Sequence, residues 1–226
     1  MVSAVRRTIT LCLLSMIARP GFSQHLASRI DTLMHEFDGP DHPGASVMVI
    51  QDGRILLTKA YGMAVLEERI PATPATNYRL GSVTKQFTAM SILMLKERGE
   101  LSLENTLSDF FPGFPAYGKT ITVRQLLHHT SGLIAYEDVM PETTTVQVHD
   151  RDVLAMMKTQ DSTYFPPGTE YRYSNTGYSL LAQIVERVSE IPFAGFLDEN
   201  IFRPTMWDRF AGDDFRVCEK LGPMYR

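Results

Sequence analysis

Residues 81–99 read GSVTKQFTAMSILMLKERG. Apolar side chains crowd residues 87–95 and leave little polar surface on a helix. We therefore predict a core helix that begins at Ser82 and ends near Gly99. Ser82 and Lys85 stand three residues apart at its start, where side chains at i and i+3 meet on one face.

A serine and a lysine at this spacing can form a nucleophilic pair. The Ser82 hydroxyl attacks only when a base removes its proton, and Lys85 can act as that base only when its charged form is destabilised. Burial at the head of an apolar helix and the positive end of the helix dipole both act in that direction. The Ser82 backbone N–H can also donate to the oxyanion of a tetrahedral intermediate. Taken alone, however, the pattern favours a Ser N-cap followed by a solvated Lys, since serine is a preferred cap.

A second group of polar residues lies in residues 167–178, PGTEYRYSNTGY. Tyr173 and Asn175 stand two apart in a predicted turn before a helix, so both can face one cleft. A tyrosine near a lysine can pass a proton to a leaving group. An asparagine donates and accepts at once, which suits it to hold the Lys85 ammonium and a substrate amide. Taken alone, the pair is better explained as a structural Tyr and an Asn cap.

Three motifs stand in one order along the chain: Ser82-x-x-Lys85, LLHHTSGL at residues 126–133, and Tyr173-x-Asn175 after a Pro-Gly turn. In order and spacing they resemble the serine β-lactamase and penicillin-binding-protein superfamily. The resemblance is to its class C branch, where Tyr-x-Asn replaces the Ser-Asp-Asn of class A enzymes. It extends from about residue 26 to residue 210.

This resemblance implies an α+β, β-lactamase-like fold, in which an antiparallel sheet has flanking helices and a helical subdomain. It implies that Ser82 forms an acyl-enzyme, that Lys85 and Tyr173 share the acid–base work, and that Asn175 supports them by hydrogen bonding. The implied function is a serine hydrolase that needs no cofactor. Its substrate would be a β-lactam, a D-Ala-D-Ala-type peptide or a small ester.

The N-terminal region predicts a helix and a β-hairpin. Apolar residues at helical spacing over residues 26–37 predict a helix that ends near residues 39–40. The apolar runs 47–50 and 54–57 flank Asp52-Gly53, a strong signal for a type I′ hairpin turn because both central residues need positive φ. Neither run alternates with polar residues, which predicts strands buried on both faces.

Three more helices are predicted downstream. Thr122 is expected to cap a short helix that closes at the turn over residues 129–132. Apolar residues within 153–157 predict a second short helix, and those within 178–188 predict a longer amphipathic one.

The first 23 residues predict export. Two arginines precede an apolar run over residues 9–18, and small residues surround a cleavage site after Ser23. The run is too short to span a membrane, so we expect a periplasmic or extracellular monomer with no stable membrane span. Cleavage would remove Cys12 and leave Cys218 without an intramolecular partner.

Charge and histidine spacing exclude other classes of function. The chain carries 22 Lys and Arg against 26 Asp and Glu, and no basic stripe, which argues against nucleic-acid binding. His128 and His129 lack the spacing of a zinc site, and the other histidines are scattered, so no metal is predicted. We expect a small molecule or peptide as the only partner.

The C-terminal region departs from the family. The resemblance implies a third motif, Lys-Thr-Gly or His-x-Gly, more than a hundred residues after Tyr173, yet the sequence ends at Arg226. Lys119-Thr120 precedes Tyr173 and cannot be that motif. The predicted organisation is a signal peptide (1–23) and a partial β-lactamase-like domain (24–226) without the C-terminal strands. This domain comprises a helix and hairpin (24–80), a helical region with the motifs (81–210) and a truncated tail (211–226).

Two other hypotheses remain open. A truncated paralogue would bind substrate or be acylated without turnover. An unrelated helical protein with chance motifs would hold Ser82 and Tyr173 far apart in space.

Overall fold

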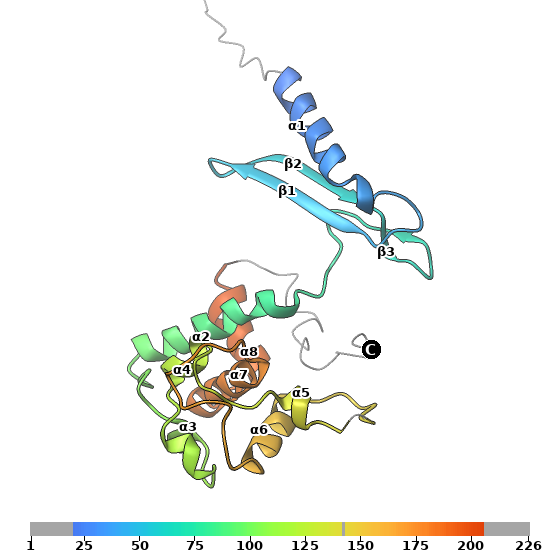
Figure 1. Cartoon of the computed structure of the whole chain (residues 1–226). Helices are drawn as coiled ribbons and strands as arrows, with labels where there is room; N and C mark the ends of the chain where they lie inside the picture. Colours follow the sequence, from blue (N-terminus) through green and yellow to red (C-terminus); the bar gives the residue numbers. More distant parts are fainter. Residues whose placement is uncertain (1–19, 142, 206–226) are drawn as a thin grey trace, which may run out of the picture. The chain divides into compact units, whose positions relative to one another are not determined.

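The computed structural model describes residues 20–141 and 143–205, which fall into two compact units, Met1–Tyr78 and Arg79–Arg226 (Figure 1). Most of the predicted signal segment (1–23) lies outside the described residues. Cys218 and the predicted tail (211–226) lie wholly outside them. Among the described residues, no helix combines the length and the apolar composition that a membrane crossing requires.

The first unit contains one long helix and two small antiparallel sheets. Helix α1 (Pro20–Leu33) and the 3-10 turn η1 (His35–Phe37) precede strands β1 (Ala45–Gln51) and β2 (Arg54–Tyr61). The predicted hairpin is confirmed, since β1 pairs with β2 and the turn residues Asp52 and Gly53 have φ angles of 50° and 72°.

The second sheet of this unit was not predicted from the sequence. It pairs β3 (Met63–Val65) with β4 (Ile70–Pro71). Strands of three and two residues are too short to show an alternating pattern, and the proline in β4 argues against a strand on sequence alone.

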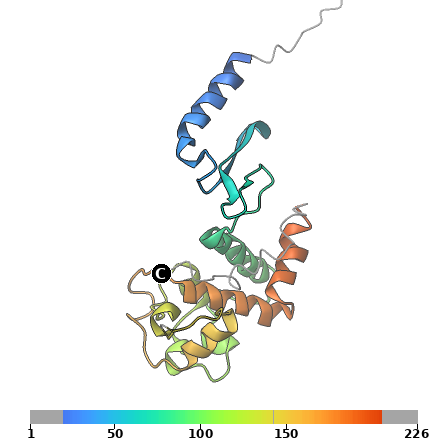
Figure 2. The same cartoon turned by 90° about the vertical axis from the view of Figure 1, so that its right-hand side faces the viewer.

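Two predictions for this unit are wrong. Helix α1 ends at Leu33, and the chain passes into a 3-10 turn before the predicted end at residues 39–40. The β1–β2 strands are not buried on both faces, because residues along β1 alternate in exposure and Met48 and Ile50 are 52% and 58% exposed. Helix α1 lies on one side of the hairpin (Figure 2), so an apolar run here did not mean two covered faces.

The second unit is helical. In chain order its described elements are η2 (Gly81–Thr84), α2 (Lys85–Glu97), α3 (Leu107–Phe110), η3 (Ala116–Lys119), α4 (Val123–Leu127), α5 (Tyr136–Val139), α6 (Asp150–Lys158), α7 (Asn175–Ser189), α8 (Phe193–Leu197) and the π-helical turn η4 (Asp198–Phe202). The three helices predicted downstream are therefore present as α4, α6 and α7. Thr122 caps α4 as expected, accepting from the Gln125 backbone N–H at 3.2 Å.

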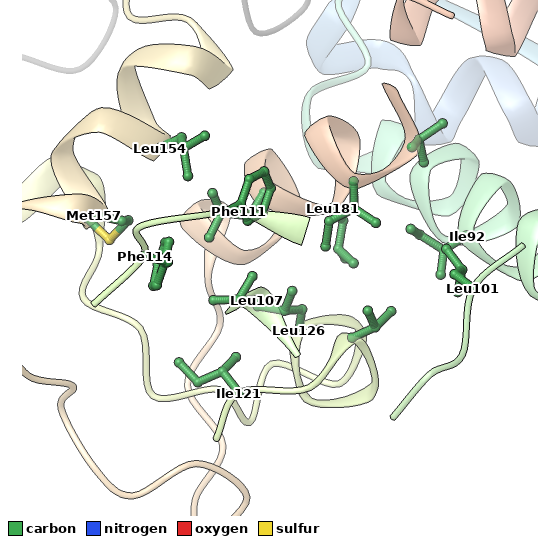
Figure 3. Packing of buried hydrophobic residues seen from close by; sticks show 14 of the residues in the cluster. Ile92, Leu101, Leu107, Phe111, Phe114, Ile121, Leu126, Leu154, Met157 and Leu181 are labelled. Carbon is green, nitrogen blue, oxygen red and sulfur yellow. The ribbon is translucent and has the colours of Figure 1, made fainter. Parts of the chain in front are cut away.

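Helix α7 lies at the centre of this unit. Leu180, Leu181 and Ile184 on α7 have no exposed surface, and their neighbours include Ile92 of α2 and Leu126 of α4 (Figure 3). Helices α2 and α7 pack against each other. This packing fixes the N-terminal end of α2 close to that of α7.

The predicted core helix is correct in position but not in burial. Ser82 lies in the 3-10 turn η2, and the α-helix itself begins at Lys85. Ile92 and Leu95 are fully buried, whereas Met90 and Leu93 are 52% and 45% exposed. Helix α2 buries only the face that it turns to the core, so its apolar composition overstated its burial.

Candidate active site

Ser82 and Lys85 meet at the N-terminal end of α2. The 3-10 turn is closed by the Val83 N–H donating to the Leu80 carbonyl at 3.1 Å and the Thr84 hydroxyl donating to the Gly81 carbonyl at 2.7 Å. Gly81 has a φ of 52°, a left-handed conformation that glycine adopts at little cost. The turn brings Lys85 Nζ to 3.2 Å from Ser82 Oγ.

Tyr173 and Asn175 approach from the N-terminal end of α7. Ser174 is the N-cap and accepts from the Gly177 N–H at 3.0 Å. Asn175 is therefore the first residue of the helix. The sequence had placed it in a turn before the helix, and that prediction is wrong. Tyr173, just before the cap, places its hydroxyl 2.5 Å from Ser82 Oγ.

Asn175 joins the two helix ends. Its Oδ1 accepts from Lys85 Nζ at 2.8 Å. All four residues predicted from the sequence are thus brought together, although Tyr173 and Asn175 lie about ninety positions after Ser82 and Lys85. This convergence contradicts the hypothesis of chance motifs, which required Ser82 and Tyr173 to lie far apart.

The surroundings of Tyr173 favour loss of its proton. Burial alone would raise the pKa of Tyr173, but hydrogen bonds to Lys85 and Ser82 and the positive charge of Lys85 outweigh it and lower that pKa from 10.0. Lys85 Nζ also lies 4.9 Å from the centre of the Tyr173 ring and 5.4 Å from that of Tyr178. A cation against two aromatic rings is attracted by their negative faces.

Lys85 is only partly buried at the head of α2. Its side chain is half-buried, Ser82 is exposed and Tyr173 is 47% exposed. What distinguishes Lys85 is its set of contacts, because hydroxyl, amide and two aromatic rings all face its ammonium group.

His129 supports the site from the turn after α4. The His129 ring packs 4.6 Å from the Tyr173 ring, and its Nδ1 accepts from the Ser174 N–H at 3.1 Å. Burial, and then the charge of Lys85, lower the pKa of His129 from 6.5.

Glu137 was missed by the sequence analysis. It lies on the four-residue helix α5, and its Oε1 accepts from Asn175 Nδ2 at 2.8 Å. No motif surrounds Glu137, so only the fold could place it beside Asn175. Among the described residues, no group of three or more His, Cys, Asp or Glu side chains is arranged to hold a metal ion.

Residues 27–226 match the family described as Beta-lactamase. The chain belongs to the beta-lactamase family. It is 36% identical over 186 residues to penicillin-binding protein 4* of Bacillus subtilis (strain 168), which covers 80% of this chain and 40% of that protein. It is 32% identical over 183 residues to protein flp of Staphylococcus aureus (strain MW2), covering 78% and 36%.

Several solved structures share the fold. An octameric penicillin-binding protein homologue from Pyrococcus abyssi superposes with a TM-score of 0.67 at 32% identity, over 82% of this chain and 43% of that one. EstCE1, a hydrolase with promiscuous acyltransferase activity, superposes with a TM-score of 0.68 at 25% identity, over 81% and 52%. The D-amino acid amidase from Ochrobactrum anthropi gives 0.63 at 27%, over 74% and 47%.

The beta-lactamase family is one of serine hydrolases, and the predicted fold, with its helices and small antiparallel sheets, is confirmed. The chain spans 40% and 36% of the length of the two curated relatives named above.

Proposed function

We propose that this protein is a serine hydrolase that forms an acyl-enzyme through Ser82. The observation that carries the proposal is the shared contact on one oxygen, because Ser82 Oγ lies 3.2 Å from Lys85 Nζ and 2.5 Å from the Tyr173 hydroxyl. A nucleophile held between an ammonium and a tyrosine of lowered pKa has both a proton acceptor and a positive charge beside it.

The proposed reaction runs in two stages. Ser82 Oγ attacks the substrate carbonyl carbon while its proton passes to the Tyr173 phenolate oxygen. The bond from the carbonyl carbon to the leaving nitrogen or oxygen then breaks, and the leaving atom takes the proton from Tyr173. In the second stage water attacks the acyl carbon of the Ser82 ester, and a proton of that water passes through Tyr173 to Ser82 Oγ as the bond from the acyl carbon to Oγ breaks. The acyl group leaves as a carboxylic acid and the Ser82 hydroxyl is restored.

Lys85 and Asn175 have supporting roles in this proposal. The Lys85 ammonium stabilises the phenolate form of Tyr173 and orients Ser82, and Asn175 fixes Lys85 through the 2.8 Å hydrogen bond. The Ser82 backbone N–H is the proposed donor to the oxyanion.

The proposed substrate is a β-lactam, a D-Ala-D-Ala-type peptide or a small ester. The named relatives support this range, since they include penicillin-binding proteins, a D-amino acid amidase and a hydrolase with acyltransferase activity. All three substrate classes share an acyl carbon that a serine can attack.

The test is a pre-steady-state burst with a fluorescent penicillin and with a p-nitrophenyl ester. We expect about one equivalent of product or label per protein molecule at first, lost in Ser82→Ala. Equal reaction of wild type and Ser82→Ala would show that Ser82 is not the nucleophile.

The same experiment separates the proposed hydrolase from the alternative of acylation without turnover. A hydrolase continues to release product after the burst, whereas a protein that is only acylated stops at one equivalent. Both outcomes keep Ser82 as the nucleophile and differ only in the fate of the acyl-enzyme.

We also propose that the protein is exported and that residues 1–23 are removed. The support is the sequence pattern of arginines, apolar run and small residues. The mass of the protein recovered from the periplasm or medium of an expressing bacterium tests this, because cleavage after Ser23 gives a mature chain that begins at Gln24. Full-length protein found only inside the cells would contradict it.

A further inference from the structure

The short helix α5 is tied to the N-terminal end of α7. The Tyr136 backbone N–H donates to Thr176 Oγ1 at 2.8 Å, and the Thr176 hydroxyl donates to the Ile134 carbonyl at 2.9 Å. Thr176 is fully buried on α7, one residue after Asn175. The backbone at the start of α5 is therefore held by the helix that carries Asn175.

A second set of contacts ties α5 to the segment before Tyr173. The Tyr164 hydroxyl donates to the Asp138 carboxylate and accepts from the Ala135 N–H at 3.0 Å. The Arg172 guanidinium lies 3.7 Å from that carboxylate and 3.9 Å from the centre of the Tyr164 ring. Glu137, between Ala135 and Asp138, thus lies on a segment that is anchored on both sides.

The anchored carboxylate determines which way the Asn175 amide points. A carboxylate can only accept, so the Asn175 NH₂ group must face Glu137, at 2.8 Å. An ammonium can only donate, so Oδ1 must face Lys85, also at 2.8 Å. Glu137 and Lys85 therefore select the same orientation of one amide from opposite ends.

We propose that Glu137 is a positioning residue of the acyl-transfer site, which holds the Asn175 amide so that its oxygen keeps the Lys85 ammonium beside Ser82. The proposal rests on the proposed function. Glu137 itself contacts Asn175 and acts on the nucleophile through it.

The charge of Glu137 has a second effect, on Tyr173. The groups that face or pack against Tyr173 are Ser82 and Lys85 from the start of α2, Glu137 from α5, His129 from the turn after α4, and Tyr178 from α7. Of these, Glu137 acts to raise the pKa of Tyr173, against Lys85. Removing the negative charge should shift the acidic limb of the acylation rate to lower pH, because Tyr173 would lose its proton more readily.

Three variants separate the hydrogen bond from the charge. Glu137→Gln keeps an acceptor for Asn175 but loses the charge, Glu137→Asp keeps the charge but is one methylene too short, and Glu137→Ala loses both. The measurement is the second-order rate of Ser82 acylation against pH, with whichever probe labels the wild type. Loss of one charge-assisted hydrogen bond at an exposed site should lower the acylation rate about tenfold in Glu137→Asp and Glu137→Ala. The rate of Glu137→Gln should stay within about threefold of the wild type. The acidic limb should move to lower pH in Gln and Ala and stay in place in Asp.

Glu97→Gln is the matched control. It removes the same charge from an exposed position at the other end of α2, about 18 Å along the helix from Lys85. We expect its rate and its limb to equal those of the wild type, and a shift as large as that of Glu137→Gln would contradict a local effect.

Two results would overturn the proposal. One is a Glu137→Ala variant whose acylation rate and acidic limb equal those of the wild type. The other is an equal loss in Gln, Asp and Ala without any shift of the limb, which would show that Glu137 only supports the fold of α5. Labelling that persists in Ser82→Ala would instead refute the proposed function, so the two failures are distinguishable.

Discussion

The two units of the molecule each contain a lysine beside a tyrosine, and the pKa values of the two tyrosines are shifted in opposite directions. In the hairpin unit Lys59 Nζ lies 6.0 Å from the Tyr61 ring, and in the helical unit Lys85 Nζ lies 4.9 Å from the Tyr173 ring. Burial and then the Asp31 carboxylate raise the pKa of Tyr61 to about 12, whereas the contacts of Tyr173 lower its pKa.

One difference between the two pairs is the group that lies between the lysine ammonium and the tyrosine hydroxyl. Asp31 accepts from both Lys59 at 2.5 Å and Tyr61 at 2.7 Å, so the carboxylate takes up the cation and holds the phenol as a donor. At Tyr173 the neutral Ser82 hydroxyl stands in that place. Tyr61 is also only 7% exposed, against 47% for Tyr173. The bridging carboxylate and the deeper burial of Tyr61 together explain why the two pKa values shift in opposite directions.

Replacement of Lys85 should have the largest effect on this comparison. In Lys85→Met the pKa of Tyr173 should rise, because a hydrogen bond and a positive charge that lower it are both lost. Less phenolate is then present at neutral pH, so the acidic limb of the acylation rate should move to higher pH. The rate at neutral pH should fall by about 10² to 10⁴, because Tyr173, the proposed proton acceptor, then loses most of what a positioned base usually contributes. Lys59→Met is the control, and an equal loss of rate there would break the comparison.

A methyl group on Gly132 tests how tightly the turn beside the site is packed. Gly132 has a φ of 70°, and a Cβ there would lie 2.3 Å from the Phe165 carbonyl oxygen. Gly53 in the hairpin turn has a φ of 72°, with nothing within 4 Å of its Cβ position. Gly53→Ala should cost about 1 to 2 kcal/mol for the left-handed backbone. Gly132→Ala should cost about 1 to 3 kcal/mol more for the clash, as measured by denaturant unfolding, and equal losses would show that the turn yields easily.

Removal of the Asp31 charge should make the two tyrosines more alike. In Asp31→Asn the pKa of Tyr61 should fall but stay above 10, since burial is the larger cause of its rise. In the wild type the protonated Tyr61 phenol contributes to the free energy of unfolding because its pKa is raised. This contribution is complete below pH 10 and is lost as the pH rises through about 12. The variant should complete that loss at lower pH. Alkaline titration of tyrosine absorbance, with Tyr61→Phe to identify the group, measures it, and an unchanged Tyr61 titration would contradict the role of Asp31.

His129 should give the smallest effect, at acidic pH. Its lowered folded pKa means that the unfolded chain binds the proton more readily, so stability is present above pH 6.5 and declines as the pH falls towards the folded pKa. His129→Gln should lose part of this acid sensitivity. Thermal unfolding between about pH 5 and pH 8 compares the two proteins, and identical pH dependence would argue against a lowered pKa of His129 in the folded protein.

Local patterns in the sequence predicted the hairpin turn, the downstream helices and all four candidate residues. Asp52-Gly53 needed positive φ, and Thr122 needed a helix to cap. Ser82, Lys85, Tyr173 and Asn175 belong to motifs whose order carried the information. Each of these signals depends on neighbouring residues or on motif order, which a single chain displays directly.

The burial of individual side chains and the contacts around the candidate residues could not be predicted from local patterns. Apolar composition predicted covered faces at Met48 and Met90, but coverage depends on which neighbour packs there. Glu137 lies 38 residues before Asn175 and has no motif of its own, so only the packing of α5 against α7 reveals it. The half-buried state of Lys85 has the same origin.

Acylation of Ser82 can be tested by the mass and the position of the adduct. Protein incubated with a fluorescent penicillin or p-nitrophenyl ester is quenched in acid, digested and mapped by tandem mass spectrometry. We predict one adduct per chain, on the Ser82 oxygen, that forms more slowly in Tyr173→Phe and is absent in Ser82→Ala. An adduct on another residue, or one that forms equally in Ser82→Ala, would show that Ser82 is not the acylated residue.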